Sequence, residues 1–378
     1  MKIKDVRAIP LHSTEKSLAA GPGACLVEVE TDTGLVGVGE ACTQSEHDEA
    51  SLAAQVIVER GMKPLLVGRD PLNVRRIWED LYFQTEWFGR AGITQYALSG
   101  VDTALWDLAG KALGVSVSRL LGGRFREDVR VYASILFDME DFGAMASEAK
   151  KWKKEGYRAV KFGWGQTRAT SFGLDAGRDE AAVRFLRDEL GPEMDIMVDV
   201  GRYVNWTVSH AIRMARTLAR YDIYWLEEAL PQDDVAGYVA LARSSPVRIA
   251  GGEGEYNRFS FERWIREHAV DIIQPDICRA GGFTEGMRIA DLVQFHNVTL
   301  VPHGFSTAVS VAANLQFVAA IQGGELLEFR RTKSPLMAKL AKRPFAAKNG
   351  RLEIPDRPGL GIEIDDSTVA ECRVKQGA

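Results

Sequence analysis

The chain has 378 residues, a formal net charge of −5, 46% hydrophobic residues and 26% charged residues. The length predicts two domains, or one barrel with an addition, and the composition is typical of a soluble globular protein. The acidic balance and the lack of basic runs argue against a nucleic-acid partner bound through its phosphates. Four scattered cysteines favour a reduced, cytoplasmic chain, and we expect no targeting or membrane-spanning segment.

The first part of the chain predicts a small α+β domain over residues 1–125. Residues 2–11 form a predicted strand, and residues 26–40 form a predicted hairpin. Helices are predicted near 45–60, 70–83 and 93–113. We expect Asp70 to cap the second helix, with Pro71 in its first turn. Strands followed by helices in this order are typical of an α+β unit.

Strands and helices alternate over residues 126–345, and an extended segment at 346–378 is expected to pack back on the first domain. The predicted strands are 129–136, 158–162, 195–199, 223–227, 247–251, 271–275, 298–302 and 325–329. The predicted helices are 142–155, 179–190, 207–220, 234–244, 258–269, 282–296, 306–321 and a poorly defined eighth at 332–341. Eight strands with right-handed helical crossovers close most economically into a (β/α)8 TIM-type barrel, so the predicted fold class is α/β.

Seven consecutive predicted strands end on an ionisable side chain. These residues are Lys161, Asp199, Glu227, Glu253, Asp276, His303 and Glu328, and they lie roughly 23 to 38 residues apart. Each spacing is about one strand plus one helix, so the seven side chains are delivered to the same end of the barrel. The active sites of such barrels lie at the C-terminal ends of the strands. The pattern therefore predicts an active site at this end.

Asp199, Glu227 and Glu253 end three successive strands and form a candidate metal site. Three converging carboxylates repel one another and raise one another's pKa, and a divalent cation relieves that repulsion. Oxygen ligands without cysteine or histidine favour a hard ion, Mg²⁺ first and Mn²⁺ second. The alternative is that each acid is paired with an arginine or a lysine.

Four further strand-end residues are candidate catalytic groups. Asp276 and His303 end neighbouring strands, so the carboxylate can hold one imidazole nitrogen while the other nitrogen faces the pocket. The alternative for His303 is a structural histidine. Lys161 is a candidate cation near the metal, or the partner of one of the three acids in a salt bridge. Glu328 donates a hydrogen bond if burial keeps it protonated, and otherwise pairs with a neighbouring arginine.

Together these groups predict one reaction centre for a small-molecule carboxylate substrate. The metal and the lysine neutralise the carboxylate, and a strand-end base removes the proton on the adjacent carbon. The metal stabilises the ene-diolate that develops. The residues therefore predict an enzyme that abstracts a proton α to a carboxylate.

In combination, the strand ends VDV, LEEAL, GGE, QPD, VPH and LEF resemble the enolase superfamily in its mandelate racemase subgroup, the mandelate racemase/muconate lactonizing enzyme family. The resemblance extends over nearly the whole chain and includes ALSGVDTALWDLAGKALG and LLGGR before the barrel. It implies an N-terminal capping domain on the barrel. It also implies Mg²⁺ on Asp199, Glu227 and Glu253, a His303–Asp276 dyad as base, and Glu328 as hydrogen-bond donor. Glu227 is preferred over Glu228 because the family ligand is the first acid of its EE(P) motif.

One departure from the family pattern bears on the reaction. The subgroup carries K-x-K on the second strand, whereas this chain has Lys161-Phe162-Gly163. The missing second lysine counts against two-base racemisation, while His303 alone suffices for β-elimination. WLEEALPQDDVAGY and the loop after KFGWG are similar to acid-sugar dehydratases of the rhamnonate dehydratase type. The resulting hypothesis is an aldonate or aldarate dehydratase, a lyase that yields a 2-keto-3-deoxy acid. The alternatives are an epimerase, a lactone cycloisomerase, or a non-catalytic barrel that binds acid sugars or metal.

The resemblance also implies where the substrate's distal end is held. The loop at 13–24, with Trp87 and Arg90, is expected to close over that end. Four residues that follow barrel strands are expected to touch substrate hydroxyls: Trp164, Arg202, Glu255 and Arg279. A homo-oligomer is expected, with a capping-domain loop near a neighbour's site.

Overall fold

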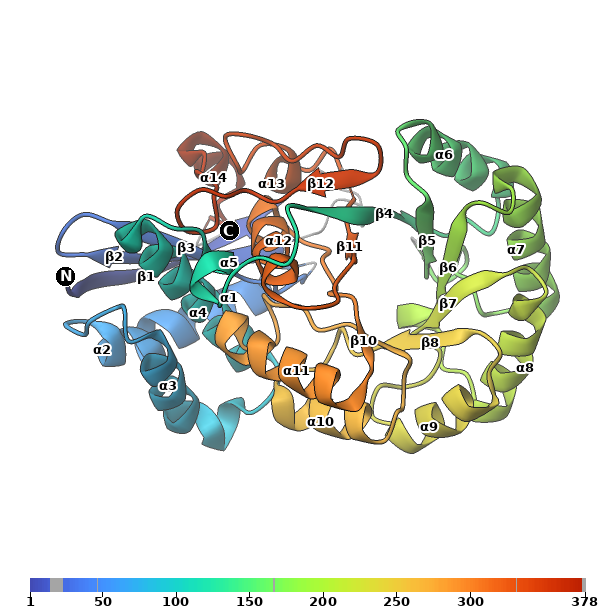
Figure 1. The fold of residues 1–378 in the computed structure, drawn as a ribbon, viewed down its shortest axis with the longest axis horizontal. Coiled ribbons are helices and arrows are strands. Elements are labelled where there is room, and N and C mark those ends of the chain that lie inside the picture. The colour runs from blue at the N-terminus through green and yellow to red at the C-terminus, as the bar shows by residue number, and fades with distance from the viewer. Residues whose placement is uncertain (14–22, 46, 166, 331, 376–378) are drawn as a thin grey trace.

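The computed structural model describes residues 1–13, 23–45, 47–165, 167–330 and 332–375. Its N-terminal part contains an antiparallel sheet of β1 (Ile3–His12), β2 (Gly23–Thr31) and β3 (Val36–Ala41), in that order. Helices follow as α1 (Glu49–Val56), a π-helical segment (Ile57–Met62), α2 (Lys63–Leu66), α3 (Val74–Gly89), α4 (Ile93–Leu113) and α5 (Val117–Leu120). This arrangement, on the left in Figure 1, is the predicted α+β unit.

Glycines on β3 allow α4 to approach the sheet closely. A Cβ atom at Gly37 would collide with the carbonyl of Ala104, and one at Gly39 would collide with the carbonyl of Gly100. Both carbonyls belong to α4, so the short strand VGVGEA is shaped to accept this helix. The buried face of α4 therefore packs directly on the backbone of β3.

The start of α3 differs from the prediction. The helix begins at Val74 and runs to Gly89, with Asn73 as its N-cap residue. Asp70 instead accepts a hydrogen bond from the backbone N–H of Leu72 at 3.0 Å, which closes a local turn. The prediction that Asp70 caps the helix is therefore wrong, because its carboxylate is used two residues later in a turn that precedes the helix.

The larger part of the chain forms the barrel, and its elements alternate around a ring in Figure 1. The strands are β4 (Asp128–Leu136), β5 (Ala159–Gly163), β6 (Asp195–Asp199), β7 (Ile223–Glu227), β8 (Arg248–Gly251), β9 (Ile272–Ile273), β10 (Thr299–Leu300) and β11 (Leu326–Glu328). The helices are α6 (Phe142–Lys154), α7 (Ala176–Leu190), α8 (Val208–Ala219), α9 (Val235–Ser244), α10 (Arg258–Arg266), α11 (Gly282–His296), α12 (Ala308–Ala320) and α13 (Pro335–Ala338). The strands are parallel in the order β10-β9-β8-β7-β6-β5-β4-β11. This confirms the predicted α/β barrel with an N-terminal α+β domain.

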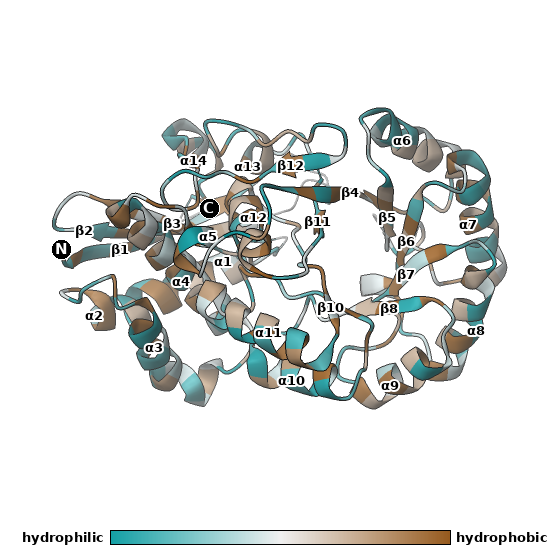
Figure 2. Cartoon of the chain, in the orientation of Figure 1, coloured by the Kyte–Doolittle hydropathy of each residue, from teal (hydrophilic) through white to brown (hydrophobic). Residues whose placement is uncertain are grey.

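Helix α8 is amphipathic, whereas α12 is buried along its whole length. In α8 the buried residues are Ala211, Met214, Ala215 and Leu218, at the spacing of one helical face. Figure 2 shows hydrophilic and hydrophobic residues mixed along α7 and α8. None of the helices in the described ranges is both long enough and apolar enough to cross a membrane.

The C-terminal segment contacts both parts of the molecule. β12 (Arg351–Glu353) pairs antiparallel with β4 of the barrel. Beyond α14 (Asp366–Cys372), the backbone N–H of Val374 donates to the carbonyl of Pro10 on β1 at 2.9 Å. The segment therefore contacts β1 of the first domain and also pairs with the barrel.

The barrel interior is layered, and the layers explain why the strand ends are polar. One apolar layer takes a residue from each strand or its direct extension: Tyr132, Ala159, Met197, Trp225, Ala250, Ile272, Val301 and Leu326. Alternate residues of a strand point to the same side, so the residues two positions later form the next layer. That layer is Ser134, Lys161, Asp199, Glu227, Gly252, Gln274, His303 and Glu328. A polar layer thus lies directly above an apolar one, at the C-terminal end of the strands.

Candidate active site

Two of the predicted metal ligands lie side by side on neighbouring strands. Asp199 on β6 pairs in register with Glu227 on β7, and both side chains are buried. The Lys161 Nζ atom lies 2.6 Å from Glu227 Oε1 and 3.7 Å from Asp199 Oδ2. The indole N–H of Trp225 donates to Glu227 Oε2 at 2.8 Å. Lys161 is therefore an ion-pair partner of the acids, which is one of the two roles that the sequence allows.

The electrostatics of this pair fit a hard cation. Burial and the neighbouring Glu227 raise the pKa of Asp199 well above its usual value, although Lys161 opposes the shift. The Asp199 Oδ1 atom is buried and has no hydrogen-bond partner. Carboxylate oxygens are the ligands that Mg²⁺ and Mn²⁺ take in proteins. The orphaned oxygen and the donor type together suit a divalent cation at this position.

The third predicted ligand points elsewhere. Glu253 lies just beyond β8, with its Oε2 atom 3.3 Å from His303 Nε2 and its Oε1 atom 3.9 Å from an Arg279 guanidinium nitrogen. As a result, no three acidic, histidine or cysteine side chains in the described part of the chain converge closely enough to hold a cation. A cation shared by Asp199, Glu227 and Glu253 requires Glu253 to turn away from His303.

Glu228 is a second acid at the same strand end, and its environment differs from that of Glu227. Its carboxylate accepts hydrogen bonds from Gln232 Nε2 at 2.8 Å and from the Gly252 N–H at 3.2 Å. Burial, followed by the charge of Glu253, raises the pKa of Glu228 to about 8. Glu228 is thus held by neutral donors, whereas Glu227 is held by the Lys161 cation.

His303 and Asp276 form the predicted pair. His303 Nδ1 lies 2.8 Å from Asp276 Oδ2, and Asp276 Oδ1 accepts from the Cys278 N–H at 2.8 Å. Both side chains are buried. Burial lowers the pKa of His303, but the charges of Glu253 and Asp276 outweigh it and the net shift is upward. The carboxylate thus fixes one imidazole nitrogen and leaves Nε2 on the side of the polar layer.

Glu328 lies beside two cationic side chains that oppose the effect of its burial. Burial favours the neutral acid, but Lys161, whose Nζ lies 3.6 Å from Glu328 Oε1, and His303 lower the pKa of Glu328 to about 2. Glu328 is therefore ionised and accepts hydrogen bonds, including one from the Gly304 N–H at 3.4 Å. The lysine at the centre of the barrel thus compensates for burial, and the role of Glu328 as a hydrogen-bond donor stays a prediction.

The position of the missing second lysine lies close to Asp199. A Cβ atom at Gly163 would lie 3.3 Å from Asp199 Oδ2, so little room separates this strand end from the acid. Trp164 packs against Gly201, where a Cβ atom would collide with the indole ring. Gly201 has a positive φ of 52°, which glycine adopts without strain. This face of the site therefore carries no lysine at position 163.

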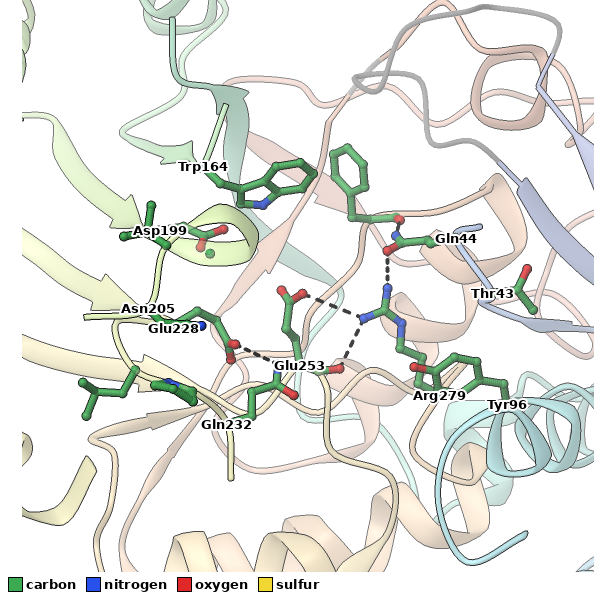
Figure 3. A pocket seen from close by; sticks show the side chains of 15 residues that line it. Thr43, Gln44, Tyr96, Trp164, Asp199, Asn205, Glu228, Gln232, Glu253 and Arg279 are labelled. Carbon is green, nitrogen blue, oxygen red and sulfur yellow. Dashed lines mark hydrogen bonds and ion pairs between the residues drawn. The ribbon is translucent and has the colours of Figure 1, made fainter. Parts of the chain in front are cut away.

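A cavity of about 430 Å³ opens over the polar layer, between the barrel and the capping domain. Trp164 and Asp199 line one side, and Arg279 lies on the other, beside Tyr96 and Gln44 of the capping domain (Figure 3). Gln44 accepts a hydrogen bond from the Arg279 guanidinium and donates one to the carbonyl of Phe305. Residues of both domains therefore form the walls of the cavity.

The predicted substrate contacts divide into two groups. Trp164 and Arg279 line the cavity, and their contact with substrate stays a prediction. Glu255 accepts from the indole N–H of Trp264 at 3.1 Å and is not among the described residues that line the cavity, so its contact with substrate stays a prediction. Trp87 is 92% exposed on the outside of α3, and neither it nor Arg90 is among the described residues that line the cavity. Residues 14–22 of the predicted loop and the side chain of Arg202 lie outside the described part of the chain.

Sequence reasoning missed the capping-domain residues of the cavity. Gln44 follows β3 by three positions, and Tyr96 lies in the first turn of α4. Neither residue belongs to a repeating pattern in the sequence. The only sequence signal for Gln44 was its place as a polar residue shortly after a strand of the first domain. Nothing in the sequence marked Tyr96 as a cavity residue.

Comparison with known proteins supports the same family. Residues 3–122 match the family "Mandelate racemase / muconate lactonizing enzyme, N-terminal domain", and residues 144–368 match "Enolase C-terminal domain-like". The chain is 36% identical over 360 residues to D-galactarolactone cycloisomerase of Agrobacterium fabrum, covering 92% of this chain and 91% of the relative. It is 34% identical over 363 residues to arabinonate dehydratase of Saccharolobus solfataricus, covering 95% and 93%.

A solved structure extends the comparison. The crystal structure of a racemase from Streptomyces coelicolor A3(2) with bound magnesium superposes with a TM-score of 0.87 at 27% identity, over 98% of this chain and 100% of that one. The barrel, the cavity and both family matches lead to one conclusion. The chain belongs to the mandelate racemase/muconate lactonizing enzyme family of the enolase superfamily.

Proposed function

We propose that this protein is a divalent-cation-dependent acid-sugar dehydratase that converts an aldonate or aldarate into a 2-keto-3-deoxy acid. The observation that carries the proposal is the buried His303–Asp276 pair, whose histidine lies in the same polar layer as Lys161 and Asp199. The base and the lysine thus lie buried in one polar layer, and Asp199 of that layer lines the cavity. Gly163 leaves the opposite face without a second lysine, which favours elimination over racemisation.

The proposed reaction begins with proton transfer to His303. The Nε2 atom takes the proton from the carbon adjacent to the substrate carboxylate, and Asp276 stabilises the imidazolium that forms. Lys161 keeps its charge, because Glu227 and Glu328 outweigh the effect of burial and raise its pKa well above the usual value. Lys161 can therefore neutralise charge that develops on the substrate carboxylate.

The second step returns the proton. The imidazolium of His303 donates to the departing β-hydroxyl, which leaves as water, and the resulting enol tautomerises to the 2-keto acid. Asp199, Glu227 and Glu253 would hold the divalent cation. When bound, it supplies positive charge beside the substrate carboxylate. Because Glu253 now contacts His303 Nε2 at 3.3 Å, the substrate hydrogen can reach this nitrogen only after Glu253 has moved.

A lactone cycloisomerase is the second candidate. It is favoured by the 36% identity to D-galactarolactone cycloisomerase. The same base and the same cation serve that reaction, but the leaving oxygen belongs to the lactone ring. It therefore stays in the product and is not lost as water. The two candidates therefore differ in product and share the first proton transfer.

The test is a screen of aldonates, aldarates and their lactones in D₂O with Mg²⁺. Formation of 2-keto acid and deuterium at the α-carbon are measured on the same samples, with His303→Asn as the blank. Keto acid that depends on Mg²⁺ supports the dehydratase and names the sugar. If a rearranged lactone forms and no keto acid is detected, the protein is instead a lactone cycloisomerase. If, for every compound tested, the wild-type protein shows no more deuterium exchange or turnover than His303→Asn, both candidate functions are contradicted.

A further inference from the structure

The indole of Trp225 lies directly beneath one of the proposed cation ligands. Its N–H donates to Glu227 Oε2 at 2.8 Å, and both side chains are completely buried. Trp225 lies two positions before Glu227 on β7, so the two side chains point to the same side of the strand, about 6.6 Å apart along it. A hydrogen bond from the apolar layer of the barrel therefore reaches into the polar layer above it.

The ring of Trp225 is held in place by other aromatic rings. Tyr132, in the same apolar layer, meets it edge to face, with 5.4 Å between the ring centroids and an interplanar angle of 89°. The ring of Tyr224 lies 5.5 Å from it. Aromatic pairs at such distances attract one another, and an indole has only two side-chain torsions to fix. The indole N–H is therefore a rigid donor that is aimed at one carboxylate oxygen.

The other oxygen of Glu227 has a more mobile kind of partner. Lys161 Nζ lies 2.6 Å from Glu227 Oε1. The same Nζ atom lies 3.7 Å from Asp199 Oδ2 and 3.6 Å from Glu328 Oε1. A lysine has a flexible four-carbon stem, so its ammonium group can exchange one of these partners for another. In the proposed function Lys161 turns to the substrate carboxylate. Of the hydrogen bonds to Glu227 in the described ranges, the one from the Trp225 indole then remains.

We propose that Trp225 is a positioning residue that fixes Glu227 for a divalent cation, so that Lys161 is free to serve the substrate. The inference rests on the cation site of the proposed function. Groups that orient a metal ligand from behind typically contribute about 10–100-fold to metal affinity. Asp199 has no partner on its Oδ1 atom, and Glu253 points away from the other two acids. Of the three acids, Glu227 is therefore the one that is already held in place.

The affinity of the full chain for Mg²⁺ tests this role. Trp225→Phe keeps an aromatic ring in the apolar layer and removes the N–H donor. We expect titration calorimetry to show Mg²⁺ binding at least about tenfold weaker than in the wild type. Trp264→Phe is the matched control, because Trp264 is also buried and its indole N–H also donates to a carboxylate, that of Glu255, at 3.1 Å. Glu255 is not one of the proposed cation ligands, so the control should keep the wild-type affinity.

Two further measurements separate positioning from packing. Trp225→Met fills the layer with a flexible apolar side chain that also lacks the donor, so it should show the same loss of Mg²⁺ affinity. With the sugar identified by the screen, the kcat of both variants should return to within about threefold of the wild-type value at saturating Mg²⁺, with KM for the sugar unchanged. A residue that acts only through packing would lower the melting temperature in EDTA and leave Mg²⁺ affinity as it is.

The proposal is overturned if folded Trp225→Phe or Trp225→Met binds Mg²⁺ as tightly as Trp264→Phe does. A wild-type chain that binds no Mg²⁺ overturns it as well, because the cation site itself is then wrong. A wild-type chain that binds Mg²⁺ but converts no acid sugar contradicts the proposed function alone. In that case the comparison of affinities among the three variants still decides the role of Trp225.

Discussion

At the scale of single residues, His303 is the side chain on which the proposed reaction depends. We expect His303→Asn to lower turnover by about 10²–10⁴-fold, the usual contribution of a general base. Cation binding should survive, because the exchange leaves Asp199 and Glu227 untouched. Turnover is measured with the sugar identified by the screen, and Mg²⁺ affinity by titration calorimetry.

The control for this variant is His268→Asn. His268 is exposed and has a φ of 50°, a conformation that asparagine tolerates well, so the exchange should leave activity and stability unchanged. Turnover of His303→Asn within a factor of two of that of His268→Asn would remove His303 from the role of base.

Asp199 carries the prediction for the cation. We expect Asp199→Asn to weaken Mg²⁺ binding at least about tenfold, since a buried anionic oxygen ligand is lost. In the absence of metal, the variant should unfold at a temperature no lower than the wild type, because a repelling charge next to Glu227 is gone. Calorimetric titration and thermal melting in EDTA measure the two effects. Asp195→Asn, at the other end of β6, is the matched control. Unchanged Mg²⁺ affinity in Asp199→Asn would show that the ligand set is wrong.

Residue types at strand ends were predictable from the sequence, whereas their protonation states were not. The two-residue alternation that places Lys161 and Glu328 in one layer follows from strand geometry. The pKa of Glu328 depends on the 3.6 Å separation from Lys161, which the sequence does not contain. For the same reason, the contact of Glu253 with His303 instead of Asp199 could not be foreseen.

At the scale of elements, two buried carboxylates of the capping domain hold the helices that follow Asp276 and His303. Glu40 on β3 accepts from the hydroxyls of Ser306 and Thr307 and from the Ser310 N–H at 3.1 Å, at the start of α12. Asp102 on α4 accepts from the hydroxyl and N–H of Thr284, in the first turn of α11. Helices α11 and α12 come directly after Asp276 and His303 in the chain. The capping domain therefore anchors the two loops that carry the proposed base.

Asp102 makes this anchoring dependent on pH. Burial raises the pKa of Asp102 to about 7, against the opposing effect of its bonds to Thr284. Between about pH 4 and 7 the folded chain keeps a proton on Asp102 that the unfolded chain has lost. Folding stability must therefore fall as the pH rises through this window. The expected loss is on the order of a few kcal/mol, since one pKa unit corresponds to about 1.4 kcal/mol.

We expect Asp102→Asn to reduce this dependence, because the amide does not titrate. Denaturation midpoints of the variant and the wild type are compared from pH 4 to pH 7, and the difference should move in favour of the variant as the pH rises. Asp141→Asn, at the exposed cap of α6, controls for the loss of a cap charge. Parallel midpoint curves for Asp102→Asn and the wild type would contradict the assignment.

Element positions followed the sequence closely where the periodicity was strong. Strands β6 and β7 begin and end at the predicted residues, because a short apolar run bounded by polar residues leaves little freedom. The start of α3 was misplaced, because an aspartate followed by proline begins a turn as readily as a helix. Such a choice is settled by packing against the rest of the domain, which local sequence does not encode.

At the scale of the whole molecule, the two domains divide the work of the site. The barrel supplies the base, the lysine and the acids, and the capping domain supplies Gln44 and Tyr96 on the far wall of the cavity. The sequence predicted the barrel wall because eight strands repeat one pattern. It did not predict the capping wall, because those residues reach the cavity only through the docking of one domain on the other.

This division predicts a separation of the kinetic constants. Tyr96 lines the cavity, and its ring lies 5.9 Å from the Arg279 guanidinium, on the side away from Asp199 in Figure 3. We expect Tyr96→Leu to raise KM about tenfold, which corresponds to about 1.4 kcal/mol of binding energy, while kcat changes less than about threefold. The reason is that substrate and transition state lose the same contact when that contact is remote from the reacting carbon. Tyr82→Leu is the control, because Tyr82 is a capping-domain tyrosine on α3 outside the cavity. A fall in kcat with unchanged KM in Tyr96→Leu would instead place Tyr96 among the residues that act on the transition state.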